Sequence, residues 1–580
     1  DGVPLFVSEL TRDVIKRAGD GSGDAATLTI PATLQGVLAA RLESAGDARP
    51  VAQVASCIGR IFDPGVLARV TGRDSVDLAA LLDTLEALAL IEPIEAGDTR
   101  YIFRHALIQE AAYQSQPKSR RRAIHGAVAD TLALSPTADD RVLANHLTAA
   151  ERYSEAVERW KGAGIRAARR SAQGEAIEHF RRGLSLLDKL PAGRDRDARR
   201  LAMLLALGPV LSSHDGYGAE TVGALYAEAA ALADSVGHPS DRFAVRRGLW
   251  MYRQMSAQYI AAEKVAQEMM ALTGDAAPDA ALSLEARRAL GATAFMLGNL
   301  RAARGHLEEA IAGYAKGDGA GNIALYGDDP GLGCMAYLSS GLWYLGEPEA
   351  ALRCCDEMLS IARRIEHPFS LARSLTFSAF TYHLMQDFDR LLPTAQEAAA
   401  LAERFEFPFH EGVGRILLGW GLCRLGDHDR GRSQIDAGFD CYNASGSHML
   451  QPLYLTLRAG LAQDCALPDE AWEMSQQSLA ALERSQENLV RPEVLRVHGE
   501  LLAQRGQVPE GLWHIDQALA VAEEQASVFC ALRAHVSASR INPGRAGALA
   551  EALARFPAEM TTADLADARA ALATIRERAG

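Results

Sequence analysis

Long apolar runs and aromatic residues are scarce in this sequence, and each absence excludes a class of protein. No stretch reaches ~18 uninterrupted apolar residues, so we expect no transmembrane helix and no membrane contact. Aromatic residues make up only 6% of the chain, although hydrophobic residues reach 48%. The apolar surface is therefore mostly Ala and Leu, which suits closely packed helices better than a β-sandwich.

Paired cysteines and an excess of basic residues are also absent. The eight cysteines among 580 residues show no CxxC spacing, and Cys354 and Cys355 are adjacent. This pattern fits neither a disulfide framework nor a zinc site, and it indicates a reducing cytoplasm. The formal net charge of −14 argues against a general nucleic-acid binder, which usually carries a basic excess.

Several catalytic signatures are missing as well. The sequence has no GxxxxGK[ST], the loop that cradles nucleotide phosphates, and no GxSxG, HExxH or EF-hand loop. The HEGVG at His410 differs from the zinc-protease pattern. We therefore expect no catalytic residues, no metal ion and no cofactor in this chain. It starts at Asp1 without Met or a signal-peptide pattern, which indicates a piece of a longer protein.

What the sequence does contain is an internal repeat. Each copy of the repeat begins with a turn that usually contains Gly and is followed by a marker residue, which is mostly small. Apolar or small residues lie four and seven positions after this marker residue. LGNLRAARGHLEEA, in which Ala303 is the marker residue, is an example. The equivalent positions are Val222, Ala262, Ala303, Ala351, Leu391, Gly431, Ala471 and Gly511, with successive spacings of 40, 41, 48, 40, 40, 40 and 40. Twelve residues before the last six of these marks lies a second series of small residues: Gly291, Ser339, Ala379, Gly419, Ala459 and Gly499.

Small residues at both positions let two helices approach closely, so each unit is predicted to be a helix, a short turn and a second helix. The pattern resembles the tetratricopeptide repeat (TPR), whose usual period is about 34 residues. HEAT and armadillo repeats have periods near 40 but lack the small-residue ladder, so they rank second, and a non-repeating bundle ranks third. We expect an α-solenoid with an extended concave surface.

The first ~135 residues lack the 40-residue step and predict a different domain. Pro31 opens one helical pattern, and ARPVAQVASCIG and DPGVLARVTG are two shorter helical patterns. SVDLAALLDTLEALALIEPI runs from a helix into a strand, and TRYIFRHALIQEAAYQS runs from a strand into a helix. Three helices followed by a β-hairpin, with EAGD at its turn, is the order of a winged-helix domain.

Longer stretches carry a family resemblance that spans nearly all of the chain. GVPLFVSEL, IPATLQGVLAARL, YIFRHALIQEAAYQSQPKSRRRAIHGAVADTL and HPFSLARSLTF resemble the downstream part of bacterial STAND-type signalling ATPases. In these proteins an AAA-type ATPase module is followed by a winged helix and TPR-like repeats. YGDDPGLGCMAYLSSGLWYLGEPEAAL is similar to members linked to class III adenylate/guanylate cyclases, and LuxR-like regulators are related. The resemblance implies ATP or ADP and Mg²⁺ in an upstream ATPase module of the parent protein.

Together these patterns predict a mainly all-α chain of four parts. Residues 1–25 are the tail of an ATPase lid region, 26–135 a winged-helix domain, 136–540 a TPR-like α-solenoid superhelix with ~40-residue repeats, and 541–580 a C-terminal helical cap. Near the start of the repeats the motif recurs only 20 residues apart, at Ala156 and Ala176, so one helix is expected to serve two pairs.

His105 is the candidate nucleotide-sensing residue. It lies in FRHALIQEAAY at a predicted strand-to-helix junction. In related STAND proteins a histidine at this junction resembles the MHD histidine, which reaches the nucleotide phosphates, and an imidazole can donate a hydrogen bond to phosphate. The alternative is a histidine that only caps or packs at the junction.

Three other polar segments could bind a ligand, but for each of them we favour a structural role. The basic run KSRRR, residues 118–122, could contact DNA or an acidic partner, but a solvated or ion-paired helix face is favoured. GDGAGN, residues 317–322, lacks the GxGxxG pattern and is interpreted as a loop insertion. Asp328 and Asp329 could bind a cation, but helix capping and turn formation are favoured.

The concave groove is the predicted place for ligand contact. The repeat register puts seven residues on or near the inner surface: Arg288, Phe295, Trp343, Arg373, Phe380, His383 and Trp420. Arginines and aromatic residues are frequent interface anchors. Phe295 and Phe380 fit equally well as core residues between repeats.

Two functional hypotheses follow. In the first, the chain is the regulatory sensor and protein-interaction region of a STAND ATPase of the adenylate/guanylate cyclase-linked type. Its repeats bind a protein or small effector, and the winged helix couples that binding to the upstream ATP switch, with oligomerisation on activation allowed. In the second, the chain is a stand-alone TPR protein-binding scaffold. The regulatory region of a LuxR-like transcriptional activator is a weaker third reading.

Overall fold

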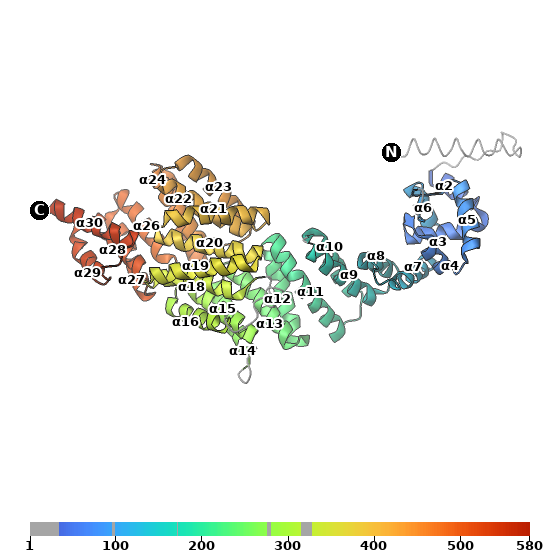
Figure 1. Cartoon of the computed structure of the whole chain (residues 1–580), viewed down its shortest axis with the longest axis horizontal. Helices are drawn as coiled ribbons and strands as arrows, with labels where there is room; N and C mark the ends of the chain where they lie inside the picture. The colour runs from blue at the N-terminus through green and yellow to red at the C-terminus, as the bar shows by residue number, and fades with distance from the viewer. Residues whose placement is uncertain (1–33, 96–98, 171, 275–279, 315–327, 580) are drawn as a thin grey trace. The chain divides into compact units, whose positions relative to one another are not determined.

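The computed structural model describes residues 34–95, 99–170, 172–274, 280–314 and 328–579. The chain forms two units, Asp1–Met203 and Leu204–Gly580, and Figure 1 shows the elements of each. The expected lid tail, residues 1–25, lies outside the described residues, as do the GDGAGN segment and most of the EAGD turn. No helix in the described part of the chain is long and apolar enough to cross a membrane.

The N-terminal unit combines helices with a small sheet. Its elements are α2 (Leu34–Glu43), η1 (Gly46–Ala48), α3 (Arg49–Ile58), β1 (Ile61–Phe62), α4 (Pro64–Thr71), α5 (Ser75–Ala87), β2 (Ile91–Pro93), β3 (Tyr101–Phe103), α6 (Ala106–Gln114), α7 (Lys118–Ala133), α8 (Asp140–Ala149), α9 (Tyr153–Arg169) and α10 (Gln173–Leu187). The strands form an antiparallel sheet in the order β1-β3-β2, with Ile102 opposite both Ile61 and Glu92.

Local sequence explains the boundaries of these helices. Asp63 caps α4 by accepting a hydrogen bond from the Val66 amide at 3.0 Å. Asp74 caps α5 in the same way. Gly72 ends α4 with a φ of +66°, a conformation that glycine adopts without a steric cost. The predicted order of helices and hairpin is present, and the structure adds β1, whose two residues are too few for a period-2 pattern.

Helix α9 lies between two partners. It packs against α8 on one side and α10 on the other. Ala156 of α9 and Ala176 of α10 are fully buried. A side chain at Gly164 would collide with the Phe180 ring, which lies 2.7 Å from the position of its Cβ. The expectation that one helix serves two closely spaced pairs is thus confirmed.

The C-terminal unit is built from helices alone in its described residues. They are α12 (Glu220–Val236), α13 (Pro239–Met255), α14 (Tyr259–Ala271), α15 (Ala280–Met296), α16 (Leu300–Tyr314), α18 (Pro330–Tyr344), α19 (Pro348–Ile365), α20 (Pro368–Met385), α21 (Phe388–Arg404), α22 (Pro408–Arg424), α23 (His428–Ala444), α24 (Gln451–Asp464), α25 (Pro468–Ser485), α26 (Arg491–Gln504), α27 (Val508–Glu524), α28 (Val528–Ile541), η2 (Pro543–Arg545), α29 (Ala546–Leu553) and α30 (Ala563–Ala579). Helix α11 (Arg194–Asp215) contains the unit boundary.

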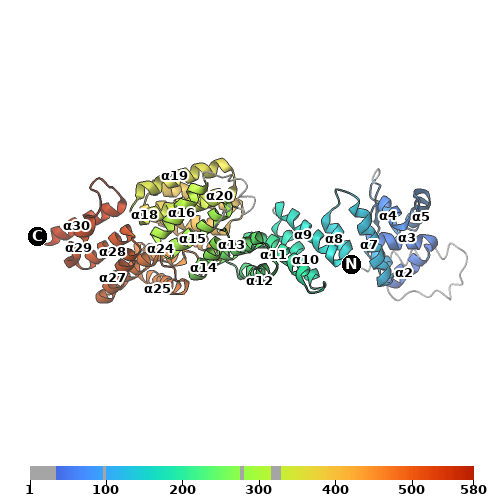
Figure 2. The same cartoon turned by 90° about the horizontal axis from the view of Figure 1, so that it is seen from below.

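The 40-residue step corresponds to antiparallel helix pairs, and the small residues lie where two helices touch. A Cβ atom at Gly419 of α22 would lie only 2.5 Å from the backbone oxygen of Gly431 in α23. Gly499 of α26 approaches Gly511 of α27 almost as closely, at 2.6 Å. Figure 2 shows α28, α29 and α30 gathered at the C-terminal end of this unit. The prediction of a mainly helical, TPR-like solenoid is confirmed.

Successive turns of this superhelix contact each other. The His448 amide donates to the Met255 carbonyl at 2.8 Å, and the Asn488 amide donates to the Met296 carbonyl at 3.1 Å. The Ser447 hydroxyl also reaches the Met255 carbonyl, across 192 residues of sequence. One superhelical turn therefore takes roughly five repeats. We call these contacts the inter-turn seam.

Candidate binding site on the inner face of the superhelix

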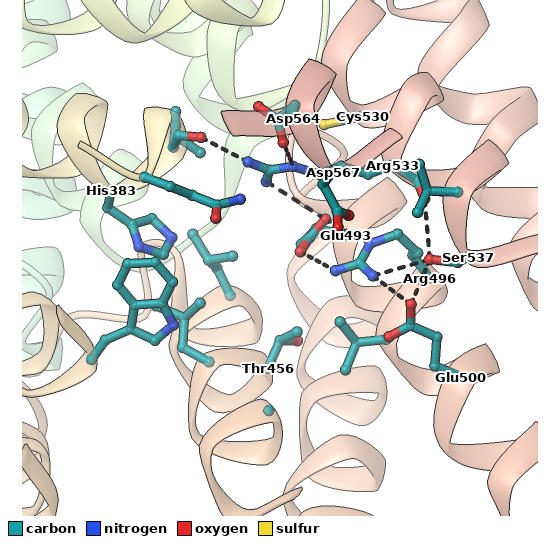
Figure 3. Close-up of a pocket in the computed structure, with 18 of the residues that line it drawn as sticks. His383, Thr456, Glu493, Arg496, Glu500, Cys530, Arg533, Ser537, Asp564 and Asp567 are labelled. Atoms are coloured by element: carbon teal, nitrogen blue, oxygen red, sulfur yellow. Dashed lines mark hydrogen bonds and ion pairs between the residues drawn. The ribbon is translucent and has the colours of Figure 1, made fainter. Parts of the chain in front are cut away.

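A cavity of about 410 Å³ lies on the inner face of the last repeats. Its walls come from the first helix of several consecutive pairs, namely α18, α20, α22, α24, α26 and α28, and from α30 of the C-terminal segment. Figure 3 shows His383 on one side of this cavity and Glu493, Arg496 and Arg533 on the other. The lining residues thus come from equivalent helices of successive repeats.

Arg496 and its two ion-pair partners, Glu493 and Glu500, form one wall of the cavity. Arg496 Nη2 lies 2.5 Å from Glu493 Oε1, and Arg496 Nη1 lies 2.8 Å from Glu500 Oε1. The Ser537 hydroxyl donates to Glu500. Burial opposes ionisation of Glu493, but the charges of Arg496 and Arg533 outweigh it and lower the pKa of this carboxyl to about 2. Glu493 therefore stays ionised and is a weak base, which suits binding rather than proton transfer.

Arg533 connects this wall to α30 and to the preceding superhelical turn. Its Nε donates to Asp564 Oδ1 at 2.6 Å, and its Nη2 donates to the Leu384 carbonyl at 2.7 Å. Its guanidinium carbon lies 4.9 Å from the centre of the Trp343 ring. Asp564 Oδ2 is buried without a hydrogen-bond partner among the described residues, so the site retains an unused acceptor.

His383 and Trp420 form the opposite wall. Their ring centres are 4.2 Å apart in an edge-to-face arrangement. His383 is only 5% exposed, and its Nδ1 has no partner among the described residues. Burial and the charge of Arg533 lower the pKa of this imidazole to about 3. His383 is therefore neutral near pH 7 and can present one donor or acceptor to a ligand.

The structure distributes the predicted groove residues over three environments. His383 and Trp420 line the inner cavity, and Arg288 and Arg373 line a second cavity. The other three, Phe295, Trp343 and Phe380, are at most 2% exposed and line neither cavity. Phe295 packs edge-to-face on Tyr337, and Trp343 stacks on Phe529.

The residues missed at the sequence level follow the same register. Arg373 lies six residues before the small residue Ala379, and Glu493 lies six before Gly499. Arg288 lies three residues before Gly291, and Arg496 lies three before Gly499. The same two positions, six and three residues before the small residue, would have identified Glu493 and Arg496 if they had been applied to the repeat that contains Gly499. Asp564 follows the last repeat, so the period carries no signal for it.

His105 caps α6. Its Nδ1 accepts a hydrogen bond from the Leu107 amide at 3.3 Å, and the side chain is half-buried. This contact matches the capping alternative, and the nucleotide role stays a prediction. In the basic run, Arg122 pairs with Glu151 and Arg121 lies over the Tyr113 ring.

The two aspartates before α18 have different partners. Asp329 caps α18 by accepting from the Leu332 amide at 2.9 Å, as the capping interpretation predicts. Asp328 instead pairs with three arginines, which the sequence interpretation did not foresee.

Comparison with known proteins gives one relative by sequence and several by structure. No family model matches the chain. An uncharacterized protein of Rhizobium meliloti (strain 1021) is 25% identical over 549 residues, which cover 92% of this chain and 53% of that protein. The chain thus spans about half the length of the curated relative it matches.

The similar solved structures are helical-repeat proteins with low overall agreement. A Rap protein complexed with Competence and Sporulation Factor has a TM-score of 0.47 and 14% identity, covering 64% of this chain and 99% of that one. A Rap conjugation regulator of plasmid pLS20 with the Phr* peptide has a TM-score of 0.42 and 13% identity, covering 64% and 95%.

A STAND protein with a tetratricopeptide repeat sensor from Pyrococcus horikoshii has a TM-score of 0.35 and 11% identity, covering 86% of this chain and 66% of that one. Because these TM-scores are all below 0.5, the assignment of the fold rests on the repeat geometry of the chain itself.

Proposed function

We propose that the C-terminal unit is a protein-interaction scaffold that binds an extended peptide segment of a partner in the inner cavity. The observation that carries this proposal is a pair of unused polar atoms in one cavity: His383 Nδ1, on the wall that also holds the half-buried ring of Trp420, and Asp564 Oδ2, on the opposite wall. A buried polar atom without a partner is costly, and a ligand that pairs with it recovers that cost.

A peptide matches the chemistry of this cavity. Its backbone N–H groups can donate to Asp564, and its side chains can pack on Trp420, since aromatic residues are common interface anchors. The arginines and carboxylates that line the cavity alternate in sign, with Arg424 paired to Asp464 and Arg540 paired to Asp567. Such alternation favours a partner with both polar donors and acceptors over a ligand of one charge.

A peptide library displayed on phage tests this function. The intact chain is immobilised, and random heptapeptides are selected on it and then titrated by isothermal calorimetry. We expect selected peptides to bind the wild type and to lose at least tenfold in affinity with Trp420→Ala. Trp513→Ala is the matched control, because Trp513 is 57% exposed and does not line the cavity. Equal affinity for both variants would overturn the assignment of this cavity.

We further propose that the chain is the regulatory region of a longer bacterial signalling ATPase of the STAND type, linked to an adenylate or guanylate cyclase. The Rhizobium meliloti relative supports a longer parent, since the match covers 53% of its length. The order α3-β1-α4-α5-β2-β3 in the N-terminal unit supports a winged helix. A peptide could then shift the ATP switch through unequal affinity for its two states.

The parent protein provides the test of this wider proposal. We expect the sequence upstream of Asp1 to contain a GxxxxGK[ST] loop, and the selected peptide to change the ATP hydrolysis rate of the intact parent. Trp420→Ala should remove the response to peptide but leave basal hydrolysis unchanged. A parent without a phosphate-binding loop would leave the stand-alone scaffold as the function.

A further inference from the structure

A second cavity, separate from the inner cavity, is lined mainly by earlier repeats of the same superhelix. It has a volume of about 310 Å³, within the range of roughly 300–1,000 Å³ typical of small-molecule sites. Its lining comes from the end of α11 and from α13, α15, α18, α20 and α22, with Ser445 and Met449 from the turn between α23 and α24. The inner cavity shares no lining residue with it.

Aromatic rings form most of one wall of this cavity. Phe369, Phe407 and Phe409 are each half-buried, so part of each ring remains exposed. Phe369 lies at the centre, with its ring 5.2 Å from Phe407 in an edge-to-face arrangement and 6.3 Å from Tyr217. Partly exposed aromatic faces that converge on one space favour a flat or branched apolar body.

Next to the aromatic wall, the cavity is lined by two positively charged side chains, Arg288 and Arg373. Arg288 makes two hydrogen bonds to Glu285, at 2.7 and 2.5 Å, and Arg373 pairs with Asp328. Arg247 pairs with the same two carboxylates, at 2.6 and 2.8 Å. These five side chains thus include three guanidinium groups and two carboxylates, and Arg373 also lies 5.4 Å from the centre of the Phe369 ring.

Glu406 is the one carboxylate side chain among the described residues that line this cavity, and it is exposed to solvent, whereas the lining arginines Arg288 and Arg373 are buried. Burial and the charge of Arg373 lower the pKa of His410 to about 3, so this imidazole is neutral. Burial also lowers the pKa of His367, whose Nδ1 accepts from the Ser370 amide at 3.4 Å. Asp329 faces Tyr314 and the Leu332 amide, and burial raises the pKa of its carboxyl.

We infer that this second cavity binds a small monocarboxylate with an aromatic or branched apolar body. The carboxylate would lie at Arg288 and Arg373, where a guanidinium can hold it by charge-assisted hydrogen bonds. The apolar body would lie against Phe369, Phe407 and Phe409. This inference does not depend on the peptide-binding proposal, because it concerns a different cavity and a different class of ligand.

Calorimetric titration of the intact chain tests the inference. The ligands are 3-phenylpropionate, its uncharged amide 3-phenylpropanamide, benzoate, 3-methylbutanoate and inorganic phosphate. We expect saturable binding of at least one carboxylate, and binding of its amide at least tenfold weaker. Arg373→Gln should bring acid and amide to equal affinity. Arg430→Gln is the control, because the Arg430 side chain is 76% exposed and does not line this cavity.

A second variant keeps the test valid if Arg373→Gln does not fold. Ser213 lines the cavity but is exposed, so Ser213→Trp should fill the mouth without disturbing the ion pairs, and carboxylate binding should fall at least tenfold. Three results would overturn the inference: no saturable binding of any carboxylate, equal affinity for acid and amide in the wild type, or phosphate binding as tightly as the carboxylates. Unchanged binding by Ser213→Trp would overturn it as well.

Discussion

Glu487 gives a quantitative test of the inter-turn seam. It is fully buried in the turn before α26, and its Oε2 accepts hydrogen bonds from the Leu450 amide at 3.2 Å and the Tyr259 hydroxyl at 3.5 Å. Tyr259 is 228 residues away in sequence. Burial raises the pKa of this carboxyl to about 8, so at neutral pH the group is mainly protonated.

The size and sign of the effect follow from this pKa. The ordinary value is 4.5, so the native state holds the proton more tightly than the unfolded chain does. The stability that the protonated group contributes is fully present below about pH 4.5 and is lost as pH rises through about 8. At ~1.4 kcal/mol for each unit of pKa, the whole loss is on the order of 5 kcal/mol.

Glu487→Gln removes the titration while keeping the shape of the neutral acid. We expect the variant to be more stable than the wild type at pH 8.5, by roughly 3–5 kcal/mol, and close to it at pH 5. Urea unfolding followed by circular dichroism at pH 5, 7 and 8.5 measures the difference. Amide exchange at Leu450 reports on the seam directly, because this amide donates to Glu487.

The control for this experiment is Glu349→Gln, since the Glu349 side chain is 91% exposed. Its difference from the wild type should stay within about 0.5 kcal/mol at every pH. A Glu487→Gln difference that does not change between pH 5 and pH 8.5 would refute the assignment of a protonated carboxyl at the seam.

The remaining predictions concern packing, ion pairing and the N-terminal unit. Gly218→Val should destabilise the C-terminal unit by about 1–3 kcal/mol in thermal unfolding, because a Cβ atom at Gly218 would collide with backbone atoms. Gly547→Ala is the control and should not destabilise the unit, because a Cβ atom at Gly547 would have no other atom within 4 Å. Arg533→Met should lower the free energy of unfolding in urea by about 3–5 kcal/mol, because it leaves buried carboxylates unpaired. Arg353→Met is the control, because the Arg353 side chain is 73% exposed, and it should lower the free energy of unfolding by less than about 1 kcal/mol. His105→Asn should keep the cap that His105→Ala loses, worth about 1 kcal/mol. If His105 also contacts phosphate, both variants release bound nucleotide faster from the intact parent, and unchanged release would exclude that role.

The repeat geometry was predictable because its cause is local and periodic. A helix pair can approach closely only where both chains carry a small residue, so Gly419 and Gly431 recur with their equivalents at the same spacing. The same register placed His383 and Trp420 at the inner cavity. The two strands of the hairpin were predicted from their flanking helices, whereas β1 was too short to leave a pattern.

The contacts of the buried charges were not predictable, because they join distant segments. Asp328 follows a stretch that looks like a turn, yet it pairs with Arg247, 81 residues earlier, and with Arg373, 45 residues later. Glu487 meets Tyr259 only because the superhelix returns after roughly five repeats. The period of a repeat predicts neighbouring pairs, but the pitch that brings separate turns together depends on small rotations summed over many interfaces.

The seam also links the two cavities to the conformation of the superhelix. Arg533 lines the inner cavity and donates to Leu384 of the preceding turn. Gly216, with a φ of +95°, lines the second cavity and lies against the backbone of Ser445, which lines it too. A ligand in the inner cavity would contact both Arg533 and Leu384, and a ligand in the second cavity would contact both Gly216 and Ser445. At a concentration 100 times its dissociation constant, such a ligand stabilises the folded chain against unfolding by about 2.7 kcal/mol, comparable with the contribution of a few buried hydrogen bonds.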